Sequence, residues 1–346
     1  MYSKSEKNRP GRKINCNFAL IIIHITNICS STRTRCHYPK DILWRLRIAT
    51  TDYNIMYDIC SIGHISHDKI VTPEKTVMMA GGTSFYMSHG ISCLPRKISY
   101  QLVTKVGDDQ RAEVENIKST GIDTICYHSR HTVRFENSYG TDHNNRRQRV
   151  LTKADPFTID DVRPLEAKVF HLGSLLADDF PTDVVEYLSS KGIVSIDVQG
   201  YLRKVVGEEV IPVDFKDKER ILALTDILKL NEHEMEVLTG DNDPRSVARC
   251  LAGYGIREVV ITLGSHGSVI YSGGKFYEIP AYKPHCLVDT TGCGDTYSTG
   301  YLYRRVLGDD VETAGRYAAA MCTLKLEHSG PFDKTEDDIL RVMDGK

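Results

Sequence analysis

The amino-acid sequence predicts an α/β fold, a three-layer αβα sandwich around a mostly parallel central sheet. Short apolar runs, such as 57–63, 193–198 and 259–264, are typical of strands that are buried on both faces. A segment with helical spacing, 183–191, precedes the second of these runs and is closed by Gly192. Strands that alternate with helices along a chain form parallel sheets with helices on both faces.

Composition bounds the class of protein. The 346 residues are 26% charged and 41% hydrophobic, and the formal net charge is −2, which gives no electrostatic reason to expect nucleic acid or an acidic membrane as partner. The ten cysteines include no C-x-x-C pair and no metal-site spacing. Cysteines scattered in this way favour reduced thiols and a cytoplasmic location.

The first 55 residues differ from the rest of the chain. They are rich in Lys, Arg, Asn and Ser, and their apolar run 18–23 is too short to span a membrane. A secretory leader is the alternative interpretation. We predict that residues 1–55 are an appended or poorly ordered extension and that residues 56–346 form one folded domain.

The chain is organised around the segment 289–295, D-T-T-G-C-G-D. A helix-patterned stretch follows at 296–307, with Gly308 as its stop. Glycines just ahead of a helix leave backbone N–H groups unpaired, and together with the helix dipole these groups make a socket for a phosphoryl group. Asp295 lies in the first turn, where its carboxylate could take a proton from a hydroxyl. The plain structural alternative is an N-capping aspartate after a glycine turn.

This segment resembles the second signature of the ribokinase-like (PfkB) carbohydrate kinases, D-T-x-G-A-G-D, with Cys293 in place of the alanine. The resemblance continues in order from about residue 57 to residue 331. It implies a ribokinase-like fold with a small β lid, in which Asp295 is the general base and the N–H groups of Gly292, Cys293 and Gly294 form the anion hole. Cys293 would contribute its backbone rather than its thiol, although a helix N-terminus lowers thiol pKa values and would expose this one to alkylation.

The resemblance also implies an acceptor site near the first strand. Asp68 matches the carboxylate that holds sugar hydroxyls, and a carboxylate can accept two such hydrogen bonds. Gly81 and Gly82 resemble the first signature, where a Gly-Gly pair lets a substrate approach the backbone. The family usually has an asparagine shortly afterwards, but this chain has Phe-Tyr-Met at 85–87, so the substrate contact is altered.

The lid is expected from about 69–80 and 124–152. The second range is polar and contains five arginines, any of which could meet the substrate, although a solvated loop is the alternative role.

Three further matches concern the phosphoryl donor. Asn231 and Glu234 resemble the N-x-x-E motif, whose glutamate organises water around Mg²⁺, and the alternative is a helix N-cap. The set Thr262, Gly264 and Gly267 resembles the T-x-G-x-x-G turn beside the nucleotide. Asp289 and the carbonyl of Thr291 match the place where many relatives bind a monovalent cation, commonly K⁺. The G-x-x-x-x-G-K-[ST] pattern of a P-loop does not occur in the sequence.

Together these features predict a carbohydrate kinase that uses ATP and Mg²⁺, with K⁺ as the candidate monovalent ion, to phosphorylate a hydroxyl of a sugar or cyclic polyol. The alternatives are a nucleoside kinase, an inositol-type kinase, which D-V-Q-G-Y-L-R at 197–203 resembles, and a catalytically silent sugar-binding regulator. Asp295 and the intact G-x-G argue against the silent regulator. The expected partners are the small-molecule acceptor and ATP, and the oligomeric state is left open, with a homodimer among the options.

Overall fold

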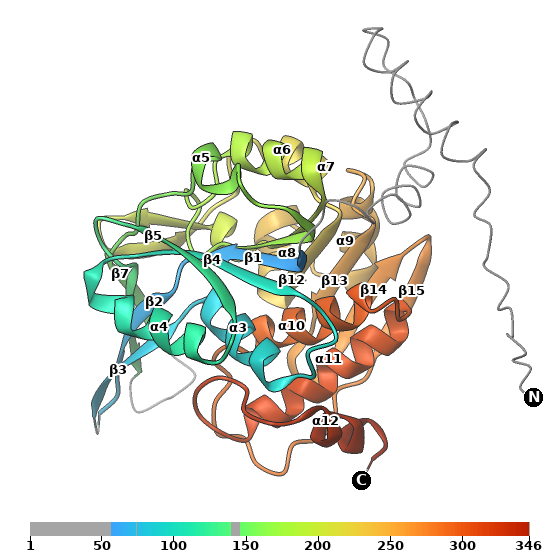
Figure 1. Cartoon of the computed structure of the whole chain (residues 1–346). Helices are drawn as coiled ribbons and strands as arrows, with labels where there is room; N and C mark the ends of the chain where they lie inside the picture. The colour runs from blue at the N-terminus through green and yellow to red at the C-terminus, as the bar shows by residue number, and fades with distance from the viewer. Residues whose placement is uncertain (1–56, 74, 140–145, 346) are drawn as a thin grey trace, which may run out of the picture. The chain divides into compact units, whose positions relative to one another are not determined.

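The computed structural model describes residues 57–73, 75–139 and 146–345, so the predicted extension at 1–55 lies outside the described residues. In this part of the chain two separate sheets form, a large one between helices and a small one at its side (Figure 1). The prediction of an α/β fold with a mostly parallel main sheet and a small lid sheet is confirmed.

The main sheet of the described chain has nine strands and is parallel except at the edge formed by its last two strands. From edge to edge the order is β15 (Lys275–Ile279), β14 (Ser268–Ser272), β13 (Glu258–Thr262), β12 (Ile227–Asn231), β9 (Ile193–Asp197), β8 (Ala167–Gly173), β1 (Tyr57–Gly63), β4 (Tyr100–Val106) and β5 (Asp123–His128).

Helices cover both faces of this sheet, and their apolar sides form two cores (Figure 1). The first core contains residues of α3 (Thr83–Cys93), α4 (Arg111–Ser119), α10 (Cys293–Val306), α11 (Val311–Leu326) and α12 (Glu336–Met343). The second contains residues of α5 (Ile159–Val162), α6 (Thr182–Lys191), α7 (Lys218–Leu224), α8 (Glu232–Thr239) and α9 (Pro244–Ala252). Short 3-10 helices occur at Asp108–Gln110, Gly200–Leu202 and Gly264–His266.

The central strands supply both cores because successive side chains point to opposite faces. On β1, Ile59 packs in the first core and Cys60 in the second. On β8, Val169 and Phe170 divide in the same way. This double burial explains why the strands are continuous apolar runs in the sequence rather than alternating ones.

Side-chain caps determine where several helices begin. Asp310 starts α11 by accepting a hydrogen bond from the backbone N–H of Thr313. Thr335 starts α12, and Asp338 completes a capping box with it. The three helices α10, α11 and α12 follow one another in the chain and contribute to the same core on one face of the main sheet (Figure 1).

The small sheet has the strand order β10 (Arg203–Val206), β11 (Glu209–Pro212), β7 (Arg146–Thr152), β6 (Arg134–Tyr139), β2 (Ser66–Val71) and β3 (Thr76–Gly81). The predicted lid ranges need two corrections. Residues 123–128 pair in parallel with β4 and so extend the main sheet. The hairpin of β10 and β11, which the sequence analysis did not assign to the lid, adds two strands through pairing with β7.

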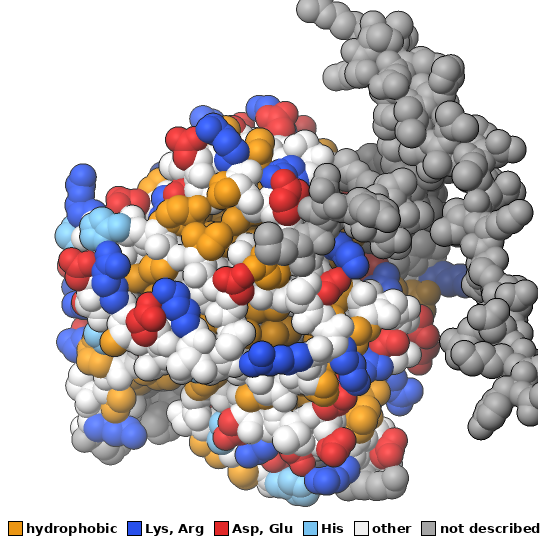
Figure 2. Space-filling model, in the orientation of Figure 1, with side chains coloured by type: hydrophobic (Ala, Val, Ile, Leu, Met, Phe, Trp, Pro, Cys, Tyr) orange, Lys and Arg blue, Asp and Glu red, His pale blue; other side chains and the backbone are white. Residues whose placement is uncertain are grey.

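Surface charge agrees with the near-neutral composition. On the face shown in Figure 2, acidic and basic side chains are interspersed rather than gathered by sign. Within the described residues, none of the helices combines the length and apolar character that crossing a bilayer requires.

Candidate active site

The predicted anion hole lies at the N-terminus of α10. Gly292 is the N-cap residue and has left-handed backbone angles, φ 76° and ψ 5°. None of the described side chains caps this helix end, which leaves its backbone donors available to an anion. The N–H of Cys293 differs from the others because it donates a long hydrogen bond, 3.3 Å, to the carbonyl of Thr290.

Both glycines of the motif have close neighbours, and the left-handed φ of Gly292 also favours glycine. A Cβ at Gly292 would lie 2.4 Å from the ring of Tyr86, and one at Gly294 would lie 2.6 Å from Nζ of Lys229. An aromatic ring and an ammonium group therefore press against the backbone of the anion hole. The motif D-T-T-G-C-G-D predicts the glycines, but the two groups that exclude a side chain come from α3 and β12.

Asp295 is partly buried in the first turn of α10. Burial and the neighbouring charge of Asp197 raise the pKa of Asp295 to about 6, while the positive charge of Lys229 opposes the rise. A carboxylate with this pKa is ionised at neutral pH and yet basic enough to accept a proton from a hydroxyl. Its position and pKa suit a general base.

Lys229 is a site residue that the sequence analysis missed. Its Nζ lies 2.7 Å from Oδ2 of Asp197, and both side chains are less than a tenth exposed. Burial alone would lower the pKa of Lys229, but Asp197, Glu234 and Asp295 together raise it above its usual value. The available signal was a lysine within the apolar strand I-L-K-L at 227–230.

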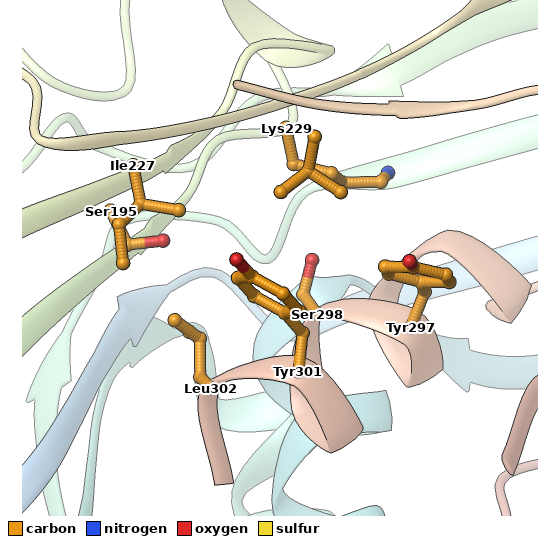
Figure 3. A pocket seen from close by; sticks show the side chains of 8 residues that line it. Ser195, Ile227, Lys229, Tyr297, Ser298, Tyr301 and Leu302 are labelled. Carbon is orange, nitrogen blue, oxygen red and sulfur yellow. The ribbon is translucent and has the colours of Figure 1, made fainter. Parts of the chain in front are cut away.

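The stem of Lys229 is enclosed by the core. It lines a small cavity between the sheet and α10, together with Ile227, two residues earlier on β12, and with Ser298, Tyr301 and Leu302 of the helix (Figure 3). The cavity has room for roughly one water molecule. Because a buried ion pair is expensive to desolvate, the fold holds Lys229 and Asp197 at the anion hole at a cost in stability.

Of the residues predicted for the acceptor, Asp68 lies on β2, Gly81 ends β3 and Gly82 is the N-cap residue of α3. Register pairs Ser66 with Gly81 and places Asp68 two residues further along β2. A Cβ at Gly81 would lie 2.8 Å from Oδ2 of Asp68 and 2.9 Å from Oγ of Ser66. At Gly82, φ is 91° and a Cβ would lie 2.5 Å from the carbonyl oxygen of His64. The Gly-Gly pair thus allows the strands of the acceptor site to approach each other.

Tyr86 links the acceptor residues to the anion hole. Its side chain is buried, and among the described residues its hydroxyl has no hydrogen-bond partner. Burial first, and then the charges of Asp295, Asp289 and Asp68, raise the pKa of Tyr86 far above its usual value, so the hydroxyl stays protonated. A neutral O–H donor therefore lies among the carboxylates of both predicted subsites.

Asn231 and Glu234 form the helix N-cap that the sequence offered as the alternative to an Mg²⁺ site. Oδ1 of Asn231 accepts hydrogen bonds from the N–H groups of His233 and Glu234, and Oε2 of Glu234 accepts one from the N–H of Asn231 at 2.9 Å. This capping box begins α8. Burial raises the pKa of Glu234, and the negative charge of Asp197 adds to the effect.

The glycine-rich turn predicted for the nucleotide follows the adjacent strand. Thr262 ends β13 and is in register with Asn231 at the end of β12, so the two motifs lie side by side at the same edge of the sheet. Gly264 and Gly267 have φ values of 53° and 86°, which favour glycine.

The arrangement of acidic side chains bears on metal binding. Over the described ranges, no three His, Cys, Asp or Glu side chains gather closely enough to hold a metal ion. Mg²⁺ usually keeps several waters and binds through one or two carboxylates and the phosphates of its substrate. The single carboxylate of Glu234 fits a water-mediated contact with such an ion.

Two residues of the central motif lie in surroundings that the sequence did not show. Burial raises the pKa of the Cys293 thiol to about 11, which opposes the lowering expected at a helix N-terminus. Oδ1 of Asp289 accepts a hydrogen bond from the N–H of Thr291, and Nζ of Lys325 lies 3.3 Å from the carbonyl oxygen of Asp289, so a buried ammonium lies beside one of the two residues predicted to hold a monovalent cation.

Comparison with known proteins identifies the family. The family model of the pfkB family carbohydrate kinases matches residues 51–338. The chain belongs to this family. It is therefore a phosphotransferase of the carbohydrate and nucleoside kinase class.

Curated relatives of this pfkB-family kinase differ in their acceptors. The chain is 30% identical to the cytidine kinase of Thermococcus kodakarensis over 255 residues, which are 71% of this chain and 88% of that enzyme. It is 28% identical to the ribokinase of Bacillus subtilis over 301 residues, 78% of this chain and 93% of that enzyme.

Solved structures give a similar range. A pyrophosphate-dependent kinase in the ribokinase family, complexed with a pyrophosphate analog and myo-inositol, superposes with a TM-score of 0.73 and 28% identity over 82% of this chain and 99% of that one. The nucleoside kinase of Methanocaldococcus jannaschii, at 22% identity and a TM-score of 0.66 over 85% of this chain and all of that one, shares the fold.

Proposed function

We propose that this pfkB-family kinase transfers the γ-phosphoryl group of ATP to a hydroxyl of a cyclic polyol or sugar. The observation that carries the proposal is the position of Asp295 beside the uncapped N-terminus of α10, with a pKa of about 6. A base with that pKa next to an anion socket is the arrangement that phosphoryl transfer to a hydroxyl requires.

In the proposed reaction, Asp295 accepts the proton of the acceptor hydroxyl while its oxygen bonds to the γ-phosphorus and the bond to the β-phosphate oxygen breaks, releasing ADP. Backbone N–H groups of Gly292 and Gly294 stabilise the charge on the transferring group. Lys229 adds a positive charge beside Gly294. A bound Mg²⁺ would neutralise phosphate charge, with Glu234 as its water-mediated contact.

In the proposed complex the acceptor lies among the side chains of Asp68, Tyr86 and Asp295. Asp68 can accept hydrogen bonds from two hydroxyls, and the hydroxyl of Tyr86, which has no partner within the described part of the chain, can donate one. Together with Asp295 they suit a ring that carries several hydroxyls. A cyclic polyol is favoured because the solved relative at 28% identity binds myo-inositol.

A nucleoside is the second candidate acceptor, supported by the 30% identity to a cytidine kinase.

ATP is favoured as donor by an exposed apolar pair that directly precedes the anion-hole motif in the chain. Leu287 and Val288, directly before Asp289, have exposed fractions of 69% and 56%. An exposed apolar pair at this place can pack against a nucleotide base, whereas pyrophosphate would leave it uncovered. Pyrophosphate remains the alternative donor, because a relative is described as pyrophosphate-dependent.

The test combines two donors with three acceptors. The full chain is incubated with ATP or pyrophosphate and with myo-inositol, D-ribose or cytidine, and the phosphorylated product is detected by ³¹P NMR. We expect turnover with ATP and myo-inositol. Turnover with pyrophosphate but not with ATP would contradict the donor that we assign. Turnover with cytidine but not with myo-inositol would contradict the acceptor.

The control for the mechanism is Asp295→Asn. This variant should keep its affinity for ATP and lose turnover by about 100- to 10,000-fold, as is usual when a general base is removed. If it keeps more than about a tenth of the wild-type kcat, Asp295 is not the base.

A further inference from the structure

The environment of Lys325 is unusual for a lysine on a helix. It lies in the last turn of α11, and its side chain is fully buried. Nζ lies 3.3 Å from the backbone carbonyl oxygen of Asp289, 3.3 Å from that of His328 and 3.7 Å from Oδ2 of Asp289. The ammonium thus lies among three oxygen atoms, and the lysine side chain is not exposed to solvent.

The segment that carries Asp289 is hydrogen-bonded to the end of the same helix. The carbonyl of Leu326 accepts hydrogen bonds from the N–H groups of Val288 and Asp289, at 2.8 and 3.3 Å. These contacts hold the strand of chain that leads into the anion hole against the end of α11. Lys325 is therefore fixed to the motif by its charge and by the backbone of the adjacent residue.

The charge of Lys325 also reaches the anion hole. It acts to lower the pKa of the Cys293 thiol, against the larger effect of burial. The same charge would favour a phosphoryl group bound by the N–H groups at this helix end.

We propose that the ammonium of Lys325 takes the place of a monovalent metal cation at Asp289, so that the protein needs no K⁺. An ammonium carries the charge of such an ion and is held here by carbonyl and carboxylate oxygens, the ligands that a hard cation would use. A metal ion at these oxygens would meet a like charge, and displacing Lys325 would leave a buried ammonium without acceptors.

The first experiment measures the cation dependence of the wild-type protein. Turnover of ATP with myo-inositol is compared in KCl, NaCl and tetramethylammonium chloride at equal ionic strength. We expect rates within about twofold of one another, since a tethered charge is always present. Activation of about tenfold or more by K⁺ would overturn the proposal.

The second experiment opens the site with Lys325→Ala. We expect kcat/KM to fall by about tenfold or more, as for loss of an electrostatic contact near the transferring group, and KCl or NH₄Cl to restore it in part. The matched control is Lys334→Ala, which removes an exposed ammonium paired with Asp333 and should change nothing. An Ala variant with wild-type activity in tetramethylammonium chloride would refute the assignment.

The kinetic comparisons rest on the proposed function, so a third readout is independent of it. Without substrates, the Tm of Lys325→Ala should rise with KCl relative to tetramethylammonium chloride, whereas the wild-type Tm should not distinguish the two salts. Lys325→Met fills the site with an apolar side chain and should show no selective response to K⁺. If no acceptor is phosphorylated, the proposed function fails, but a Tm response confined to the Ala variant still supports the cation site. Equal responses in all three proteins would contradict it.

Discussion

Replacing Lys229 with methionine should move the acid limb of the pH–rate profile to higher pH. The pKa of Asp295 is about 6, and a general base must be ionised, so wild-type kcat/KM should fall as pH drops through about 6. By that titration, the rate at pH ~5 should be about a tenth of its plateau. Lys229 holds this pKa down, because its positive charge stabilises the carboxylate.

The size of the shift follows from the charges that remain. Without Lys229, burial and the negative charge of Asp197 act on Asp295 with less opposition. Loss of an opposite charge at close range raises a carboxylate pKa by about 1 unit or more, so the variant should run at about half its plateau or less at pH ~7. The wild type should run at about nine-tenths of its plateau at the same pH.

The assay is kcat/KM for the acceptor, measured between about pH 5 and pH 9 with saturating ATP and with a stability check at each pH. Lys229→Met leaves Asp197 buried without its partner, which typically destabilises a fold by about 3–5 kcal/mol. The double variant Lys229→Met/Asp197→Asn removes both charges and should return the acid limb toward the wild-type position. An acid limb that does not move in the single variant, while its plateau is measurable, would refute a role of Lys229 in setting the pKa of the base.

Two further predictions concern the walls of the site. Tyr86→Phe removes only a hydroxyl that has no partner among the described residues, so the KM for the acceptor should rise by about tenfold while the KM for ATP stays unchanged. The matched control is Tyr317→Phe, which removes another buried hydroxyl of the same kind. An unaltered acceptor KM in Tyr86→Phe would contradict the assignment. Cys293→Ala should keep a near-normal kcat, and the wild type should resist iodoacetamide at neutral pH because its thiol pKa is about 11. A loss of kcat by two orders of magnitude in the Ala variant, or rapid inactivation of the wild type, would mean that the thiol is ionised or takes part.

The parts of the site that depend on neighbouring residues were predictable from the sequence. The glycines at 292 and 294 specify a helix start with free N–H groups, because backbone freedom and helix-end polarity are local properties. The apolar runs predicted the parallel strands for a similar reason, since burial on both faces leaves no polar alternation. For Asn231 and Glu234 the sequence allowed two interpretations, an Mg²⁺ site and a helix N-cap, and the capping box in the structure is the second of these.

Contacts between distant segments were decided by the tertiary structure alone. The family resemblance put residues 124–128 in the lid, but pairing with β4 assigns them to the main sheet. A helix N-terminus should lower the pKa of the Cys293 thiol, yet burial under the packed helices raises it. Lys229 meets Asp197 across 32 residues and Lys325 meets Asp289 across 36. Each charge is intelligible only beside its partner, because the energy of a buried ion depends on what the fold brings within a few ångströms of it.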